Sequence, residues 1–252
     1  MDLVVATLAE RTDLIPLVND FPAAWPEFMF HDVATAGVYD AVVLAHPEYC
    51  LVALDQLADA RLVAKGFTLP FSWTGDPDSN LPSAGYDAVV TGAVLSRLTG
   101  QRGNLVSAVE VTIQRSARGS GISSVMLMAM RDNAARLGYT SLVAPVRPSR
   151  KHEHPDISMA EYVSWTREDG LPVDPWLRVH VRAGARIVGV APRSMTVVGS
   201  LDDWRAWTGM SFDSDGLVQV PGALVPVRCD LDRDLAVYVE PNVWVHHPLT
   251  PG

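Results

Sequence analysis

Two glycines in the middle of the chain, Gly119 and Gly121, have the setting of a phosphate-binding loop. Before them, residues 105–113 alternate apolar and polar side chains with period two, which predicts a strand. After them, apolar residues recur at helical spacing through 122–137. A helix that begins directly after such a loop points its first backbone N–H groups, and the positive end of its dipole, at open space. Residues 116–121 therefore predict a site where backbone amides bind an anion.

The neighbouring residues exclude two common phosphate loops and one catalytic turn. A Walker A loop needs Lys and Ser or Thr after its last glycine, but Ile122 and Ser123 follow Gly121. A dinucleotide fingerprint needs three glycines, and only two are present. The Gly119-Ser120-Gly121 spacing also differs from the Gly-x-Ser-x-Gly turn of serine hydrolases.

Residues 116–121, Ser-Ala-Arg-Gly-Ser-Gly, resemble the loop that binds the acyl-CoA pyrophosphate in the GNAT superfamily of N-acyltransferases. The signature of that family is Arg/Gln-x-x-Gly-x-Gly/Ala, after a strand and before a helix. This chain matches both glycines and the context, but it has Ser116 at the first position. A later predicted helix places His180 four residues before Gly184, where the family commonly has Tyr.

The resemblance implies an α/β (α+β) fold. We expect a mixed, mostly antiparallel central sheet with flanking helices and a splayed strand pair that holds the pantetheine arm. Pro145 in the strand expected at 141–146 suits a position where the ladder has opened. The chain, 1–252, is interpreted as one domain with inserted segments at about 74–104, 148–173 and 200–215.

The implied reaction moves an acyl group from CoA, by default from acetyl-CoA, to a small amine by direct attack in a ternary complex. Alternative hypotheses are transfer to a hydroxyl or a carrier-protein thiol, and a non-catalytic module that binds acyl-CoA. The residues implied to bind the cofactor are Arg118, Gly119, Ser120, Gly121, Ile122 and Ser123 around the phosphates, and Val111 and Ile113 through their backbone. Arg118 is equally consistent with a solvated loop charge.

Two side chains are candidates for catalysis. Glu110 is the ionisable residue of the 105–113 strand, and desolvation beside an apolar tunnel would raise its pKa toward that of a general base. The alternative is a surface or salt-bridged glutamate. His180 could donate a proton to the departing thiolate or act as the base. The alternative is a structural histidine. Period two predicts Val109, Val111 and Ile113 on one face of the strand and Glu110 on the other.

Composition limits the partners. The formal net charge of -9 over 252 residues argues against nucleic acid and is compatible with a cationic substrate. No apolar run approaches the roughly 20 residues that span a membrane. Cys50 and Cys229 are far apart, which indicates a reduced, cytoplasmic protein. We expect no metal, because His152-Glu153-His154 and His246-His247 lack ligand spacing.

The periodicities predict an alternation of strands and helices. Strands are expected at 3–8, 49–54, 61–71, 105–113, 141–146, 186–198, 216–227 and 235–245, and helices after a Thr12 or Asp13 cap and at 32–45, 86–98, 122–137, 158–168, 174–184 and 201–208. The inserted helix 86–98 could cover the acceptor site, form the interface of a homodimer or simply cover the core. Aromatic walls for the acceptor are expected from Tyr162, Trp165, Trp176 and 242–244.

Overall fold

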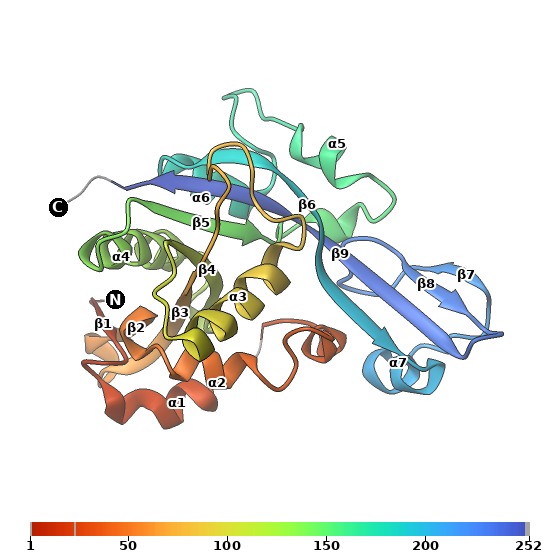
Figure 1. Ribbon diagram of the computed structural model, residues 1–252, viewed down its shortest axis with the longest axis horizontal. Coiled ribbons are helices and arrows are strands. Elements are labelled where there is room, and N and C mark those ends of the chain that lie inside the picture. Colours follow the sequence, from red (N-terminus) through yellow and green to blue (C-terminus); the bar gives the residue numbers. More distant parts are fainter. Residues whose placement is uncertain (1, 23, 250–252) are drawn as a thin grey trace.

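The computed structural model describes residues 2–22 and 24–249 of the chain. This part forms a nine-stranded sheet in the order β1-β2-β3-β4-β5-β9-β8-β7, with β6 also paired to β9 (Figure 1). The strands are β1 (Leu3–Thr7), β2 (Cys50–Asp55), β3 (Arg61–Phe71), β4 (Leu105–Ile113), β5 (Ser141–Val146), β6 (Arg186–Gly199), β7 (Gly216–Val218), β8 (Val227–Asp230) and β9 (Leu235–Pro248). The β4–β5 pair is parallel, whereas the other strand pairs are antiparallel.

Helices cover both faces of this sheet. They are α1 (Ile15–Asn19), α2 (Tyr39–Leu44), α3 (Gly85–Thr99), α4 (Ile122–Arg136), α5 (Met159–Val163), α6 (Pro175–Arg182) and α7 (Leu201–Thr208). The long strands β6 and β9 run out of the body into an arm that carries α7, β7 and β8 (Figure 1). The expected fold class, a mixed and mostly antiparallel sheet with flanking helices, is confirmed.

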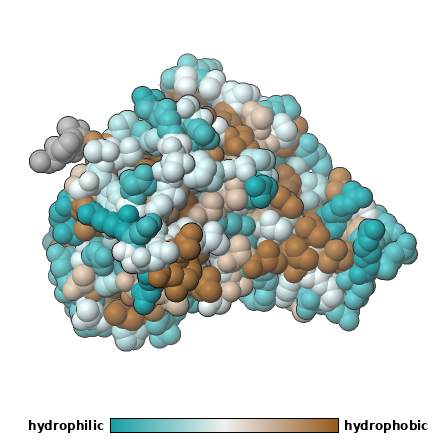
Figure 2. All heavy atoms as spheres, in the orientation of Figure 1, coloured by the Kyte–Doolittle hydropathy of each residue, from teal (hydrophilic) through white to brown (hydrophobic). Residues whose placement is uncertain are grey.

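Two apolar cores lie on the two faces of the sheet. The α3 core includes Phe67, Tyr86 and Val109, and the α4 core includes Met126 and Leu177. On the face in Figure 2, hydrophobic residues gather in separate areas rather than in one continuous band. No helix within residues 2–22 and 24–249 is long and apolar enough to cross a membrane.

The pair β4–β5 opens shortly after it forms. Its ladder joins Val106 to Leu142 and Ser107 to Val143, and it ends there. Pro145 lies past the last of these pairs, where its missing N–H removes no bond to β4. The expected splayed strand pair is therefore present. From Ala108 onward, one edge of β4 has no strand partner among residues 2–22 and 24–249.

A β-bulge in β4 changes which side chains share a face. The register with β3 shifts between Phe67, which pairs with Glu110, and Thr68, which pairs with Ala108. A bulge interrupts the period of two because two residues on one strand oppose one on the other. Val109 belongs to the α3 core, whereas Val111 and Ile113 pack against the α4 core. The expectation that these three residues share one face was wrong, and the bulge is the reason.

The helix expected at 32–45 is shorter than predicted. Asp32 is buried, and its Oδ1 accepts hydrogen bonds from the amides of Ala34 and Thr35 while its Oδ2 accepts one from Thr196 of β6. These bonds hold the segment in turns, so α2 begins only at Tyr39.

Three other boundaries differ from the sequence expectations. The 158–168 helix ends at Val163, because Thr166 forms a bridge with Pro172. The strand expected at 216–227 is split into β7 and β8 by a turn that contains Gly222 with φ of 84°. Neither Thr12 nor Asp13 caps α1 with its side chain, and a 3₁₀ turn leads into that helix instead.

Candidate active site

A cavity of about 490 Å³ lies in the opening between β4 and β5. Val109, Glu110 and Val111 line it from β4, and 144–146 line it from β5. Its other lining residues include Arg118 from the glycine loop and His180 from α6. The cavity therefore joins the predicted phosphate loop to both candidate catalytic side chains.

The glycine loop has the backbone that an anion site needs. Gly119 has φ of 79° and Gly121 has φ of 87°, a left-handed region that favours glycine. Gly121 is the N-cap of α4, so the first amides of that helix have no intrahelical acceptor. A Cβ built on either glycine would have no neighbour within 4 Å, and this shows that the loop borders open space.

Two side chains hold the shape of this loop. Ser120 Oγ donates to the carbonyl of Ala117 at 2.6 Å, and Arg118 Nε donates to the carbonyl of Ile113 at 3.3 Å. Arg118 is exposed and also lines the cavity. Its guanidinium therefore lies between the end of β4 and the loop, with other donors left for a ligand.

The free edge of β4 presents backbone groups to the cavity. Beyond the bulge, Thr112 pairs with Lys65 and the amide of Gln114 donates to the carbonyl of Val63 in β3. In an antiparallel ladder, alternate residues bond to the same neighbour. Val111 and Ile113 therefore direct their N–H and C=O groups toward the edge that β5 has left.

Glu110 lies at the bulge, held by three neighbours. Its Oε2 accepts from the hydroxyl of Tyr39 at 2.9 Å, and its Oε1 accepts from Thr112 Oγ1 at 2.8 Å. Lys65 Nζ lies 3.1 Å from Oε1 and forms an ion pair. These contacts fix the orientation of the carboxylate. Glu110 is therefore salt-bridged, as in the alternative left open by the sequence, and it also lines the cavity.

A second cavity of about 410 Å³ lies on the α3 side of the sheet, and Glu110 lines both cavities. Its walls are aromatic and carry charges of both signs. The aromatic residues are Phe21, Trp25, Phe30, Tyr39 and Tyr86, and the charged residues are Asp40, Lys65 and Glu110. With two carboxylates and one ammonium, the lining has an excess of one negative charge, which suits a cationic ligand.

His180 is buried in the wall of the first cavity, on the α4 side. Its Nδ1 lies 2.9 Å from Nε2 of His247 in β9, and the ring of Trp176 packs edge-on against it. Burial, and to a lesser extent the neighbouring ring of His247, lowers the pKa of His180 well below its ordinary value. The imidazole is therefore neutral at physiological pH. Within the described chain, its Nε2 has no hydrogen-bond partner.

The two candidate catalytic residues reach one cavity from opposite faces of the sheet. Glu110 bonds to Tyr39, which packs against the α3 core. His180 packs against Trp176, which belongs with the α4 core. The opening between β4 and β5 is what lets both line the same space.

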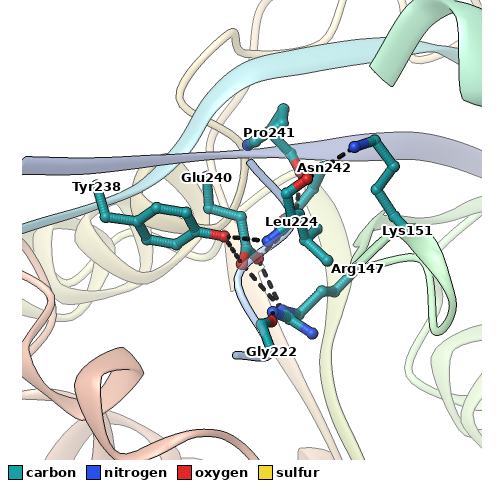
Figure 3. Close-up of polar contacts among 8 residues, drawn as sticks. All are labelled: Arg147, Lys151, Gly222, Leu224, Tyr238, Glu240, Pro241 and Asn242. Carbon is teal, nitrogen blue, oxygen red and sulfur yellow. Dashed lines mark hydrogen bonds and ion pairs between the residues drawn. The ribbon is translucent and has the colours of Figure 1, made fainter. Parts of the chain in front are cut away.

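A buried ion pair forms the far wall of this cavity. Glu240 of β9 is fully buried and accepts from Arg147 Nε, with Oε2 at 2.9 Å. Tyr238 and Asn242 also donate to this carboxylate, at 2.7 Å and 2.9 Å, and both side chains converge on it in Figure 3. The sequence missed this cluster, because nothing near Arg147 indicates a partner 93 residues away.

In the basic loop 147–155 after β5, two of the cations are held by other parts of the protein. Arg147 is held by Glu240 and by the carbonyl of Gly222. Lys151 is fully buried, and its Nζ donates to the carbonyl of Leu224 (Figure 3) and to that of His154. The loop still contributes Ser149 and His152 to the cavity lining.

The aromatic walls come partly from residues that the sequence did not single out. Trp176 and Asn242, expected at the acceptor site, line the first cavity and not the second. Tyr162 and Trp165 instead pack on each other and on His154. Trp25, Tyr39 and Tyr86 were missed, because they are brought to the site by tertiary packing and carry no local signal.

Among the residues that the structure describes, no group of three His, Cys, Asp or Glu side chains could hold a metal ion. Cys50 and Cys229 are both free and buried.

Comparison with known proteins identifies relatives of this chain. It is 32% identical over 272 residues to the arginine N-acetyltransferase avaD of Aspergillus versicolor, with 96% of this chain and 93% of that protein covered. Among solved structures, it resembles the loading GNATL domain of CurA from Lyngbya majuscula, with a TM-score of 0.53, 16% identity, and coverage of 98% and 96%. It also resembles the GphF GNAT-like decarboxylase in complex with isobutyryl-CoA, with a TM-score of 0.53, 16% identity, and coverage of 99% and 100%. No family model matches the chain.

The full-length similarity to an N-acetyltransferase agrees with the splayed strands and the glycine loop at the start of α4. These findings confirm an enzyme that moves an acyl group from CoA to an amine. The chain belongs to the GNAT superfamily of CoA-dependent N-acyltransferases.

Proposed function

We propose that this enzyme transfers the acetyl group of acetyl-CoA to a small cationic amine, with arginine as the first candidate, by direct attack of the amine on the thioester. The observation that carries the proposal is the position of Glu110. This carboxylate lines both the cavity between β4 and β5 and the acidic, aromatic cavity on the α3 side. An acyl group in the first cavity and an amine in the second would therefore meet at Glu110.

In this proposal, acetyl-CoA binds along the opening between β4 and β5. The pyrophosphate accepts hydrogen bonds from the amides of 118–123, the amide of Ser120 among them, with the hydroxyl of Ser123 and the guanidinium of Arg118 as further donors. The hydroxyl of Ser120 instead holds the loop, because it donates to the carbonyl of Ala117. The pantetheine arm pairs with the free backbone groups of Val111 and Ile113. The open space at both loop glycines supports this placement.

Glu110 acts as the general base in the proposed mechanism. Its carboxylate takes a proton from the substrate ammonium, and the neutral amine then attacks the thioester carbonyl. The hydroxyls of Tyr39 and Thr112 orient the carboxylate, and Lys65 balances its charge. The C–N bond forms, the C–S bond breaks, and the electron pair leaves with sulfur. The proton that the attacking nitrogen then loses neutralises the thiolate.

His180 stabilises the departing sulfur by a hydrogen bond. Because its pKa lies well below the ordinary value, the ring is neutral and is a poor donor of a whole proton. An N–H on Nε2 would instead donate to the sulfur as negative charge develops there, which is electrostatic stabilisation of the transition state. This hypothesis keeps His180 in contact with the reaction without requiring it to ionise.

The proposed acceptor follows from the lining of the α3-side cavity. Asp40 and Glu110 provide negative charge, and the rings of Trp25 and Tyr86 can lie against a planar cation. The relative at 32% identity is an arginine N-acetyltransferase, which supports a substrate with a guanidinium group.

The proposed binding site for acetyl-CoA is tested by calorimetry with CoA and acetyl-CoA, using wild type, Gly119→Trp and Gly100→Trp. Both glycines have positive φ and open space around them, but Gly100 ends α3 away from the cavity between β4 and β5. Loss of binding in Gly119→Trp alone is the expected result. Wild-type protein that binds neither ligand, or equal binding by both variants, would overturn the placement of the cofactor.

The proposed preference for a cationic amine is tested by comparing acetyl transfer to arginine with transfer to citrulline, its uncharged analogue. We expect kcat/KM to be at least tenfold higher for arginine, and mass spectrometry of the product shows which nitrogen is acetylated. Equal rates would refute a cation-selective site. A wider panel of amines and acyl-CoA donors would then identify the substrate.

We also expect the enzyme to act in the cytoplasm, where the free thiols of Cys50 and Cys229 would stay reduced. Cell fractionation that finds the protein in an oxidising compartment would contradict this.

A further inference from the structure

Two buried histidines form a pair in the wall of the cavity between β4 and β5. His180 of α6 is 1% exposed and His247 of β9 is fully buried. Nδ1 of His180 and Nε2 of His247 are 2.9 Å apart, so one of these nitrogens carries the proton that they share. Burial lowers the pKa of His180 well below its ordinary value and that of His247 to about 3, so both rings are neutral.

Two arrangements of protons are open to a neutral pair. If His247 donates from Nε2, His180 must carry its own proton on Nε2. If His180 donates from Nδ1, its Nε2 is a bare lone pair. In the described part of the chain, Nε2 of His180 and Nδ1 of His247 have no hydrogen-bond partner, so neither nitrogen is fixed by another contact.

The charge that acts on this pair comes from α4. Arg131 Nη1 donates to the carbonyl of Ala183 at the end of α6 at 2.6 Å, which fixes the guanidinium beside the helix that carries His180. The positive charge of Arg131 helps to lower the pKa of His247, and a smaller effect comes from His246. Arg131 Nε is buried and also has no partner in the described residues.

A cation favours a lone pair over an N–H at the unpartnered nitrogen of a nearby ring. Either arrangement leaves one histidine N–H without a protein acceptor, on Nε2 of His180 or on Nδ1 of His247. The charge of Arg131 acts on His247 and is not among the causes that lower the pKa of His180, so an unpaired N–H on His247 would lie on the ring that this cation affects. Placing the His247 proton on Nε2 leaves the lone pair on Nδ1 and directs the N–H at His180. This arrangement is therefore lower in energy.

We propose that His247, in the field of Arg131, is a positioning residue that holds His180 in the tautomer with its proton on Nε2, the nitrogen left without a protein partner. In this state a buried N–H in the wall of the cavity, without a protein acceptor, is available to a ligand that reaches Nε2 of His180. The inference rests on the proposed function only for the identity of that ligand, the departing sulfur. The tautomer itself is a property of the free protein.

The direct test is nitrogen NMR of protein labelled with ¹⁵N-histidine, with the His180 signals identified by their loss in His180→Phe. The expected spectrum at neutral pH shows a protonated Nε2 and a bare Nδ1 for His180. The opposite pattern, with the proton on Nδ1, would overturn the proposal. This measurement needs no substrate, so it stands even if acetyl transfer is not detected.

Substitution of His247 separates positioning from packing. The amide of His247→Gln keeps an N–H donor at a position close to that of imidazole Nε2, whereas His247→Phe fills the space without a donor. We expect His247→Phe to lower kcat at least tenfold with little change in KM, and His247→Gln to restore most of it. An equal fall in kcat in both variants, or a change in KM with kcat unchanged, would overturn the proposal.

Arg131 is tested in the same NMR experiment. In Arg131→Met, the charge is removed while an apolar chain of similar length remains. We expect the pKa of His247 to rise and the His180 tautomers to become mixed. An unchanged spectrum would show that Arg131 does not select the tautomer.

Discussion

The buried histidine pair makes a quantitative prediction about stability in acid. An unfolded histidine takes up a proton as the pH falls through about 6.5. In the folded protein, burial and the charges of Arg131 and His246 lower the pKa of His247 to about 3. Between these values the unfolded state binds more protons, so acid favours unfolding. Stability is therefore retained above pH 6.5 and is lost as the pH falls toward 3.

The size of the effect follows from linkage. For each buried neutral histidine, the free energy of unfolding falls by about 1.4 kcal/mol for each unit by which the pH falls within this window. Between pH 6.5 and 5 the contribution of His247 is about 2 kcal/mol. His180, whose pKa is also lowered well below its ordinary value, contributes a similar amount by the same reasoning.

One carboxyl group opposes this trend. Burial and the neighbouring Asp32 raise the pKa of Asp87 to about 8, while its ordinary value is about 4. In the folded state Asp87 therefore holds a proton that the unfolded state releases, and its contribution to stability grows as the pH falls through 8. As the pH falls, the histidines lower the stability of the wild type while Asp87 raises it. The contribution of His247 must therefore be measured as a difference between the wild type and a His247 variant.

The assay is urea denaturation of wild type, His247→Gln and the exposed control His152→Gln at pH 8, 6.5 and 5. We expect the loss of stability between pH 6.5 and 5 to be smaller in His247→Gln than in wild type by about 2 kcal/mol. The control should follow the wild type. An identical loss in all three proteins would show that His247 titrates in the folded state as it does when unfolded, and would refute the argument for a neutral pair.

Two further substitutions test the catalytic carboxylate and the buried ion pair. Glu110→Gln should lower kcat by about 10²- to 10⁴-fold, the usual contribution of a general base, while calorimetry shows unchanged CoA binding; full activity would exclude Glu110 as the base. Glu240→Gln should lower the urea-derived unfolding free energy by about 3–5 kcal/mol, because Arg147 would remain buried with an uncompensated charge. Asp230→Asn, which removes the surface partner of Arg233, is the matched control and should not change stability measurably.

The parts of the fold that the sequence predicted well are those specified by local residues. Asp174 followed by Pro175 predicted the start of α6, and the Asp174 side chain does accept from the amides of Trp176 and Leu177. The glycine loop predicted the start of α4 at Ile122. Each feature is encoded within a few consecutive residues, so its physics can be evaluated without knowing the tertiary structure.

The features that could not be predicted depend on distant partners. Asp32 was interpreted as the start of a helix, but it bonds to the amide of Thr196, 164 positions away. Glu110 could be placed on a strand, but Tyr39, 71 positions earlier, orients it. Glu240 and Arg147 gave no signal as a pair. For each of these residues, the local sequence shows which chemical group is present. It does not show the distant contact that decides what the group does.

The β4 bulge shows how one local irregularity changes the chemistry that a strand can support. Without it, period two would place Glu110 on the face opposite Val109, with the α4 core and His180. The register shift instead places the carboxylate on the α3 side, where it lines the cavity with Asp40 and the aromatic rings. In the proposed mechanism, the base must contact the incoming amine and the hydrogen-bond donor must contact the departing sulfur. The amine approaches one face of the planar thioester, whereas the sulfur lies in its plane on the same carbon. A bulge that places Glu110 on the α3 side and leaves His180 on the α4 side therefore lets each residue contact its own partner in the proposed transfer.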